Sequence, residues 1–263
     1  MIGVFDSGFG GLTVLNSLHE NLPEYQYLYY GDNKNAPYGN KNKDEIYKLT
    51  KSALDFMFSK GAILIIVACN TVSVEVLRKI QNFYKHKTNK KRILGVVVPN
   101  LEYIEINKDI SRLGIIGTSK TIDSLKYEKE LKIRRPDLKV YSNACPKFVN
   151  YIEADQHKTD EALANIKKEL IFIKKKSIKH LLLACTHYSI IKNEIKNNIP
   201  KETHIIDTVD IISNQTKVYI NNHPELMLDK KNTTMFYSSM DINNFKTIAN
   251  KILIKKEKRK FIF

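Results

Sequence analysis

The order of apolar and polar positions along the chain predicts strands that alternate with helices. Short apolar runs bounded by glycine or polar residues indicate strands at residues 2–5, 25–30, 62–68, 93–98, 112–116, 139–142, 180–184, 205–207 and 234–237. Helical spacing of apolar positions indicates helices at residues 12–21, 44–59, 72–84, 119–131, 160–175 and 243–254. This alternation predicts an α/β fold with largely parallel sheets.

A short motif occurs twice in this pattern. Ala68-Cys69-Asn70-Thr71 and Ala184-Cys185-Thr186-His187 each follow an apolar strand and precede a helix. Open α/β sheets bind ligands beyond the carboxyl ends of their strands. Two such half-domains facing each other, with a first boundary near residue 93, place the cysteines on opposite walls of one cleft. Symmetric walls around a planar intermediate suit the inversion of a carbon centre.

The two cysteines are candidates for catalysis, although free cysteine is also a common core residue. A thiol at a helix N-terminus meets the positive end of the helix dipole, so we expect the thiolate of Cys69 to be favoured. Cys185 near His187 suits acyl transfer as well as proton transfer. The duplication favours proton transfer, because acyl transfer needs one nucleophile. Cys145 precedes Pro146 without comparable polar neighbours, and we interpret it as structural.

Composition narrows the class of protein. The chain has 263 residues, 43% hydrophobic and 27% charged, which is typical of a globular protein. Its longest apolar run, residues 62–69, is too short to span a bilayer, and the first residues do not resemble a signal peptide. Three cysteines form no disulfide framework and fit no zinc spacing, so we expect no metal site and a reducing, cytoplasmic location.

The formal net charge of +15 raises the question of nucleic acid. Basic residues cluster at residues 85–92, 174–180 and 255–260. The chain lacks aromatic–basic interleaving and zinc modules. We therefore attribute the charge to solvated helix faces and a basic tail, and expect no specific nucleic-acid partner.

Several short motifs occur in order along the chain. They are residues 3–15 (GVFDSGFGGLTVL), 30–32 (YGD), 37–39 (PYG), 68–71 (ACNT), 114–118 (GIIGT), 144–146 (ACP), 185–188 (CTHY), 236–239 (FYSS) and 244–245 (NF). The loop at residues 6–11, within the first motif, matches neither a dinucleotide-binding fingerprint nor a Walker sequence. Together and in this order, the motifs make the chain resemble the glutamate racemase family, within the aspartate/glutamate racemase superfamily.

The resemblance implies two pseudo-symmetric open parallel-sheet α/β domains with the active site in the cleft between them. The domains are residues 1–92 plus 208–263, and residues 93–207. The implied activity is racemisation of glutamate for peptidoglycan without pyridoxal phosphate, any other cofactor or a metal. We also expect a homodimer with no membrane partner.

The resemblance also assigns residues. Cys69 acts on D-glutamate and Cys185 on L-glutamate, as paired base and acid. Asp6 and Asp32 support the Cys69 side, and His187 and Glu153 support the Cys185 side. The substrate-contacting residues are Asp6, Ser7, Tyr38, Gly39, Asn70, Thr71, Thr186 and His187.

A few positions depart from the family pattern. Ala184 replaces a glycine and Ser189 a proline around Cys185. Ala154 and Asp155 follow Glu153 where the family has glutamate and glycine, and residues 207–209 read DTV where it has DSG. None of these changes removes a residue that the resemblance assigns to catalysis.

Three other functions are alternatives. Aspartate racemase differs by one methylene in its substrate, which a pocket discriminates by only about 1–3 kcal/mol. A basic nucleic-acid-binding protein on an inactive racemase fold is a second alternative, and both cysteines argue against it. A dithiol redox protein is the third, and it needs Cys69 and Cys185 within disulfide reach.

Overall fold

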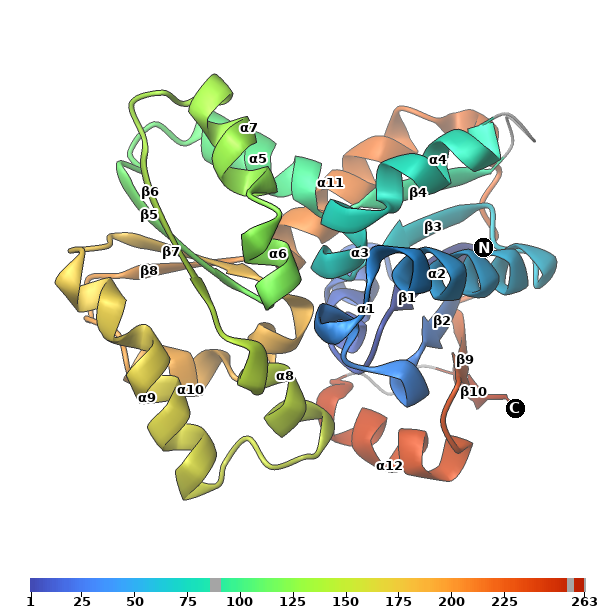
Figure 1. Cartoon of the computed structure of the whole chain (residues 1–263). Coiled ribbons are helices and arrows are strands. Elements are labelled where there is room, and N and C mark those ends of the chain that lie inside the picture. The colour runs from blue at the N-terminus through green and yellow to red at the C-terminus, as the bar shows by residue number, and fades with distance from the viewer. Residues whose placement is uncertain (86–90, 255–257, 263) are drawn as a thin grey trace.

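Two parallel β-sheets form the framework of the protein (Figure 1). The computed structural model describes residues 1–85, 91–254 and 258–262. The first sheet contains β1 (Ile2–Asp6), β2 (Tyr27–Gly31), β3 (Leu64–Val67), β4 (Arg92–Gly95), β9 (Thr233–Ser238) and β10 (Lys258–Phe261). The second contains β5 (Arg112–Gly117), β6 (Lys139–Ala144), β7 (His180–Ala184) and β8 (His204–Asp207). The predicted parallel α/β fold is confirmed.

The two sheets share one strand order. The first runs β10-β9-β2-β1-β3-β4 and the second runs β6-β5-β7-β8. β2-β1-β3-β4 therefore corresponds to β6-β5-β7-β8, and every strand pair is parallel. Cys69 follows β3 and Cys185 follows β7, which occupy equivalent places. The internal repeat read from the sequence is thus a repeat of topology.

Helices cover both faces of each sheet (Figure 1). The first sheet lies between two sets: α1 (Gly11–Asn21), α11 (Thr208–Asn221) and α12 (Ile242–Ile252) on one face, and α2 (Lys43–Ser59), α3 (Asn70–Glu75) and α4 (Leu77–Lys85) on the other. The second lies between α5 (Val97–Ile106) and α7 (Lys126–Arg134) on one face, and α8 (Pro146–Glu153), α9 (Asp160–Lys175) and α10 (Lys192–Asn197) on the other. Burial on both faces explains why the central strands read as continuous apolar runs.

The strand predicted at residues 93–98 is wrong in its second half. β4 ends at Gly95, and α5 begins at Val97. A side chain at Gly95 would place its Cβ 2.1 Å from Leu77 Cδ2, so α4 packs against the backbone at this point. Pro99 lies in the first turn of α5, where its missing N–H costs no helical hydrogen bond.

Two predicted helices are each divided in the structure. The segment at residues 72–84 breaks at Val76 into α3 and α4. The segment at residues 119–131 becomes α6 (Ser119–Asp123) and α7, separated by Leu125 in the left-handed region at φ 53°. Helices α5, α8, α10 and α11, strand β10, and the short 3-10 helices at Asn33–Asn35, Tyr38–Asn40, Thr186–Ser189 and Pro224–Leu226 were not predicted.

Helix α11 joins the two halves. Val209 and Ile212 pack into the core of the first sheet, and Ile211 packs into that of the second. We propose the predicted division into a first half, residues 1–92 plus 208–263, and a second half, residues 93–207, with one change. The first boundary moves to Gly95 at the end of β4, because β4 pairs with β3 in the first sheet.

The predicted basic segments are only partly described. Residues 86–90 and 255–257 lie outside the described residues. Residues 258–260, the end of the segment predicted to be a basic tail, instead belong to β10, which pairs with β9. In the described part of the chain, we find no helix with the length and apolar character needed to cross a membrane.

Candidate active site

Cys69 lies at the carboxyl end of β3, where it caps the N-terminus of α3. Its sulfur is 3.3 Å from Ser7 Oγ, in the loop that follows β1. Burial raises the pKa of the Cys69 thiol to about 12, and the Asp6 carboxylate adds to this effect. The expectation that Cys69 favours the thiolate is therefore wrong for this structure. α3 has only six residues, and its dipole does not offset removal of the sulfur from water.

Cys185 occupies the equivalent place after β7, at the start of the 3-10 helix Thr186–Ser189. Its sulfur is 3.9 Å from His187 Nδ1, and His187 Nε2 is 2.5 Å from Glu153 Oε1. Burial alone lowers the pKa of His187, but hydrogen bonds to Cys185 and Glu153 outweigh burial and hold this pKa well above its ordinary value. An imidazolium therefore lies between the sulfur and the carboxylate.

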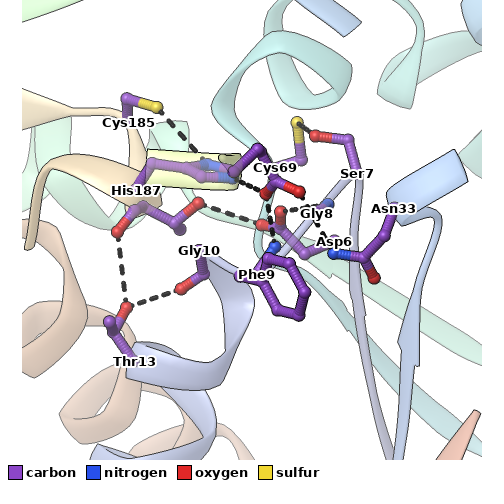
Figure 2. A network of polar contacts seen from close by, with 12 residues as sticks. Asp6, Ser7, Gly8, Phe9, Gly10, Thr13, Asn33, Cys69, Cys185 and His187 are labelled. Carbon is purple, nitrogen blue, oxygen red and sulfur yellow. Dashed lines mark hydrogen bonds and ion pairs between the residues drawn. The ribbon is translucent and has the colours of Figure 1, made fainter. Parts of the chain in front are cut away.

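Asp6 ends β1 and connects the two halves of the site. Its Oδ1 accepts a hydrogen bond from Gly8 N, and its Oδ2 accepts one from Thr186 Oγ1, both at 3.0 Å. Burial raises the pKa of Asp6 to about 6, although His187, Thr186 and Gly8 oppose this effect. Figure 2 shows this network with the Cys185 sulfur on one side of His187 and the Cys69 sulfur on the other.

Glu153, at the end of α8, also bonds to the first half. Its Oε1 accepts a hydrogen bond from Phe9 N at 2.7 Å, and its Oε2 accepts one from Asn33 Nδ2 at 3.3 Å. The Ala154 and Asp155 that follow therefore do not prevent Glu153 from reaching His187.

Asp32, Tyr38 and Gly39 lie in the loop after β2. Tyr38 OH donates to Asp32 Oδ2 at 2.5 Å, and Asn35 Nδ2 also donates to this carboxylate. The hydrogen bonds of Asp32 thus hold Tyr38 and do not reach the Cys69 thiol. Gly39 lies against the second half, where a Cβ would be 3.0 Å from Thr118 Cβ.

Asn70 and Thr71 begin α3 directly after Cys69, and both contact the second half. Tyr127 OH donates to Asn70 Oδ1 at 2.8 Å. Thr71 Oγ1 is 2.9 Å from Thr118 Oγ1, which is 3.1 Å from Thr121 Oγ1. Sequence reasoning assigned no role to these second-half partners. Thr118 has a detectable signal, since it follows strand β5 as the other site residues follow theirs.

The third cysteine lies apart from this network. Cys145 is the N-cap residue of α8 and is fully buried in the core of the second sheet, and burial raises the pKa of its thiol. All three cysteines are free. Among residues 1–85, 91–254 and 258–262, no group of three or more histidine, cysteine, aspartate or glutamate side chains is arranged to hold a metal ion.

A cavity of about 690 Å³ lies elsewhere, among residues of α4, α5, α7 and α11. None of the predicted site residues lines it. This cavity and the acid–base side chains therefore point to different places for the active site. We place the site at the cysteines, because the polar contacts between the two halves converge there.

Comparison with known proteins assigns the chain to a family. A family model described as Asp/Glu/Hydantoin racemase matches residues 2–216. The chain belongs to this racemase family. It is therefore a racemase, an isomerase, as the sequence motifs indicated.

Relatives in the racemase family match over nearly the whole chain. Glutamate racemase 2 of Caldanaerobacter subterraneus is 35% identical over 261 residues, covering 99% of this chain and 96% of the relative. The glutamate racemase of Clostridium novyi is 34% identical over 243 residues, covering 92% of both chains.

Solved structures of racemases agree with this assignment. Glutamate racemase isoform RacE1 from Bacillus anthracis superposes with a TM-score of 0.88 at 29% identity, covering 100% of this chain and 97% of that one. The glutamate racemase of Francisella tularensis, in complex with D-glutamate, gives 0.86 at 28% identity with the same coverage. The aspartate racemase of Picrophilus torridus gives 0.58 at 17% identity over 88% of this chain and 95% of that one, which shows a shared fold alone.

Proposed function

We propose that this chain interconverts L- and D-glutamate by proton transfer between Cys69, Cys185 and the substrate α-carbon, without a cofactor. The observation that carries the proposal is the placement of the two thiols at equivalent strand ends, on either side of one polar network (Figure 2). Glutamate racemases at 34–35% identity support glutamate as the substrate.

The different surroundings of the two sulfurs assign their resting roles. Cys69 holds its proton, because its pKa is about 12. We assign Cys185 as the base that takes the α-proton of L-glutamate, because Nδ1 of His187 lies 3.9 Å from its sulfur and the raised pKa of this histidine favours the imidazolium. The electron pair of the broken C–H bond stays on the α-carbon, and Cys69 donates its proton to the opposite face.

The carbanion-like transition state needs electrostatic stabilisation, because an α-proton is far less acidic than a thiol. Asn70 and Thr71 begin α3, and Thr186 begins the 3-10 helix after β7. We assign their backbone and side-chain donors to the substrate carboxylate and ammonium groups, together with Asp6 and Ser7. Tyr38 and Gly39 complete the contacts, and Asp32 acts by holding Tyr38.

The wider roles are part of the same proposal. D-glutamate made by this chain supplies peptidoglycan synthesis in the cytoplasm, and the active protein is a homodimer. Aspartate racemase remains the alternative activity, so aspartate is assayed beside glutamate.

The first test follows solvent deuterium into the α-position of each glutamate enantiomer, without added pyridoxal phosphate, nucleotide or metal. We expect exchange and racemisation with glutamate and little with aspartate. Cys69→Ala and Cys185→Ala should each lower racemisation by about 10²- to 10⁴-fold, the range for one acid–base group. Cys145→Ala should keep most of the activity. Loss of activity after dialysis against a chelator and a carbonyl-trapping reagent contradicts the cofactor-free mechanism.

The second test assigns each cysteine to one face of the substrate. Glutamate analogues with a leaving group at Cβ need only one base for elimination. Cys69→Ser should eliminate the L-analogue and not the D-analogue, and Cys185→Ser should show the reverse, because a hydroxyl is much harder to ionise than a thiol. Equal loss of both eliminations in both variants contradicts the two-face assignment.

A further inference from the structure

A buried chain of hydrogen bonds lies behind Asn70. Asn100 on α5 donates from Nδ2 to Tyr127 OH at 3.0 Å and to Thr208 Oγ1 at 3.1 Å. Tyr127 OH donates to Asn70 Oδ1, and Thr208 Oγ1 donates to Leu183 O, both at 2.8 Å. Asn70, Asn100, Tyr127 and Thr208 are each at most 2% exposed. These hydrogen bonds therefore connect α3, which follows Cys69, with β7, the strand that ends before Cys185.

The direction of these bonds is fixed from one end. The hydroxyl of Thr208 gives its only proton to the backbone carbonyl of Leu183, so it accepts from the Asn100 amide. The NH₂ group of Asn100 therefore points at both hydroxyls, and its second proton goes to Tyr127. Tyr127 in turn gives its own proton to Asn70 Oδ1. The oxygen of the Asn70 side chain therefore accepts the hydrogen bond from Tyr127, which fixes the orientation of the Asn70 amide.

With its oxygen bonded to Tyr127, the Asn70 amide still has its Nδ2 group available as a donor. In the described part of the chain, the buried Nδ2 of Asn70 has no hydrogen-bond partner. A buried amide donor without a partner costs free energy that a bound acceptor recovers. Asn70 directly follows Cys69, so a carboxylate of the substrate bound there is the acceptor of fitting charge.

We propose that Tyr127 and Asn100 are positioning residues that orient the Asn70 amide, so that its Nδ2 faces the substrate carboxylate. This inference rests on the proposed function, because it takes glutamate as the ligand beside Cys69. Without the Tyr127 proton, the Asn70 amide is free to turn by 180° and to present its oxygen to an anion, which is repulsive.

A double-mutant cycle tests this role. Tyr127→Phe removes one oxygen atom and should lower kcat/KM for glutamate about five- to tenfold, the value of one hydrogen bond. In the Asn70→Ala background the same change should have no further effect, since Tyr127 acts through Asn70. Tyr84→Phe is the matched control, because its buried hydroxyl bonds to Asp55 outside the site. This control should leave kcat/KM unchanged.

Asn100→Asp provides a second route if Tyr127→Phe does not fold. The new carboxylate offers no donor, so Tyr127 OH turns toward it and accepts from Asn70 Nδ2 instead. The loss in kcat/KM should then be at least as large as that expected for Tyr127→Phe, in protein whose folding is checked by thermal melting.

The outcomes separate this inference from the proposed function. A wild-type protein that does not racemise glutamate overturns the proposed function. If the wild type is active, the positioning role is overturned when Tyr127→Phe lowers kcat/KM equally in the wild-type and Asn70→Ala backgrounds. An absence of any loss in folded Tyr127→Phe or Asn100→Asp overturns it as well.

Discussion

At the scale of single residues, Asp6 shows how burial and hydrogen bonding compete. The carboxylate is fully buried, and burial raises its pKa although Thr186 and Gly8 donate to it. Asp6 ends β1, and its carboxylate joins two strand-end loops by accepting from Gly8 after β1 and from Thr186 after β7. The same burial that isolates the site from water therefore makes the folded protein sensitive to pH at this residue.

Stability should fall as pH rises through the titration of Asp6. The pKa of Asp6 is raised from 3.8 to about 6, so the folded state binds its proton more tightly than the unfolded state does. Between these pH values the unfolded state releases the proton first, and the accumulated loss is about 3 kcal/mol. Asp6→Asn has no such proton. We therefore expect the stability of wild type relative to Asp6→Asn to fall by about 2 kcal/mol between pH 4 and 7, because part of the total loss already occurs below pH 4.

Urea unfolding of both proteins at several pH values measures this difference. The raised pKa of His187 contributes stability that is present below pH 6.5 and is lost only as pH passes its folded value, so it acts at higher pH. Subtracting the two proteins cancels that contribution to the extent that His187 is unchanged. A difference that stays constant from pH 4 to 7 contradicts the raised pKa of Asp6.

At the scale of elements, the loop before α1 and the 3-10 helix after Cys185 approach each other closely. A Cβ at Gly10 would be 2.5 Å from Thr186 Oγ1 and 2.6 Å from the backbone nitrogen of His187. The His187 nitrogen is a backbone atom held in the 3-10 helix, so no change of side-chain rotamer makes room for a methyl group at Gly10.

Gly10→Ala should therefore separate the two loops. We expect a loss of about 1–3 kcal/mol of stability, the usual cost of overpacking, and a fall in racemisation of about 10²-fold from displaced groups. Gly114→Ala is the control, because its Cβ would meet only Ile178 side-chain atoms, at 3.0 Å and 3.1 Å, and Leu181 Cδ1 at 3.2 Å. The control should lose stability and keep its activity per folded molecule, as measured by denaturant melts and racemisation assays.

The elements also show how far sequence reasoning reaches. Strands β3 and β7 were predicted because strands buried on both faces are continuous apolar runs. Helix α5 was missed because Val96, Val97 and Val98 extend the apolar run of β4, and only the packing of Leu77 on Gly95 ends the strand. Polar residues at strand ends were likewise accessible to prediction. Asn100 and Tyr127 were not, because they lie within helices and nothing local distinguishes them from surface residues.

At the scale of the whole molecule, the site is closed. Cys69 and Cys185 are each 6% exposed, and Asp6, Thr186 and His187 are at most 3% exposed. Hydrogen bonds such as Thr186–Asp6 and Phe9–Glu153 join the halves across it. We therefore expect glutamate to reach the thiols when the halves move apart, a motion that exposes far less surface than unfolding does.

Alkylation of the three cysteines distinguishes opening from unfolding. In the free protein, we expect Cys69 and Cys185 to react with iodoacetamide at rates that depend weakly on urea, because opening exposes little new surface. Cys145 lies in the core of the second half and should react with a steep urea dependence. Glutamate at 100 times its dissociation constant should slow Cys69 and Cys185 about 100-fold by holding the halves together. Mass spectrometry of each cysteine peptide gives the separate rates. If all three cysteines show the same steep urea dependence, the site opens only by unfolding, and substrate entry needs another route.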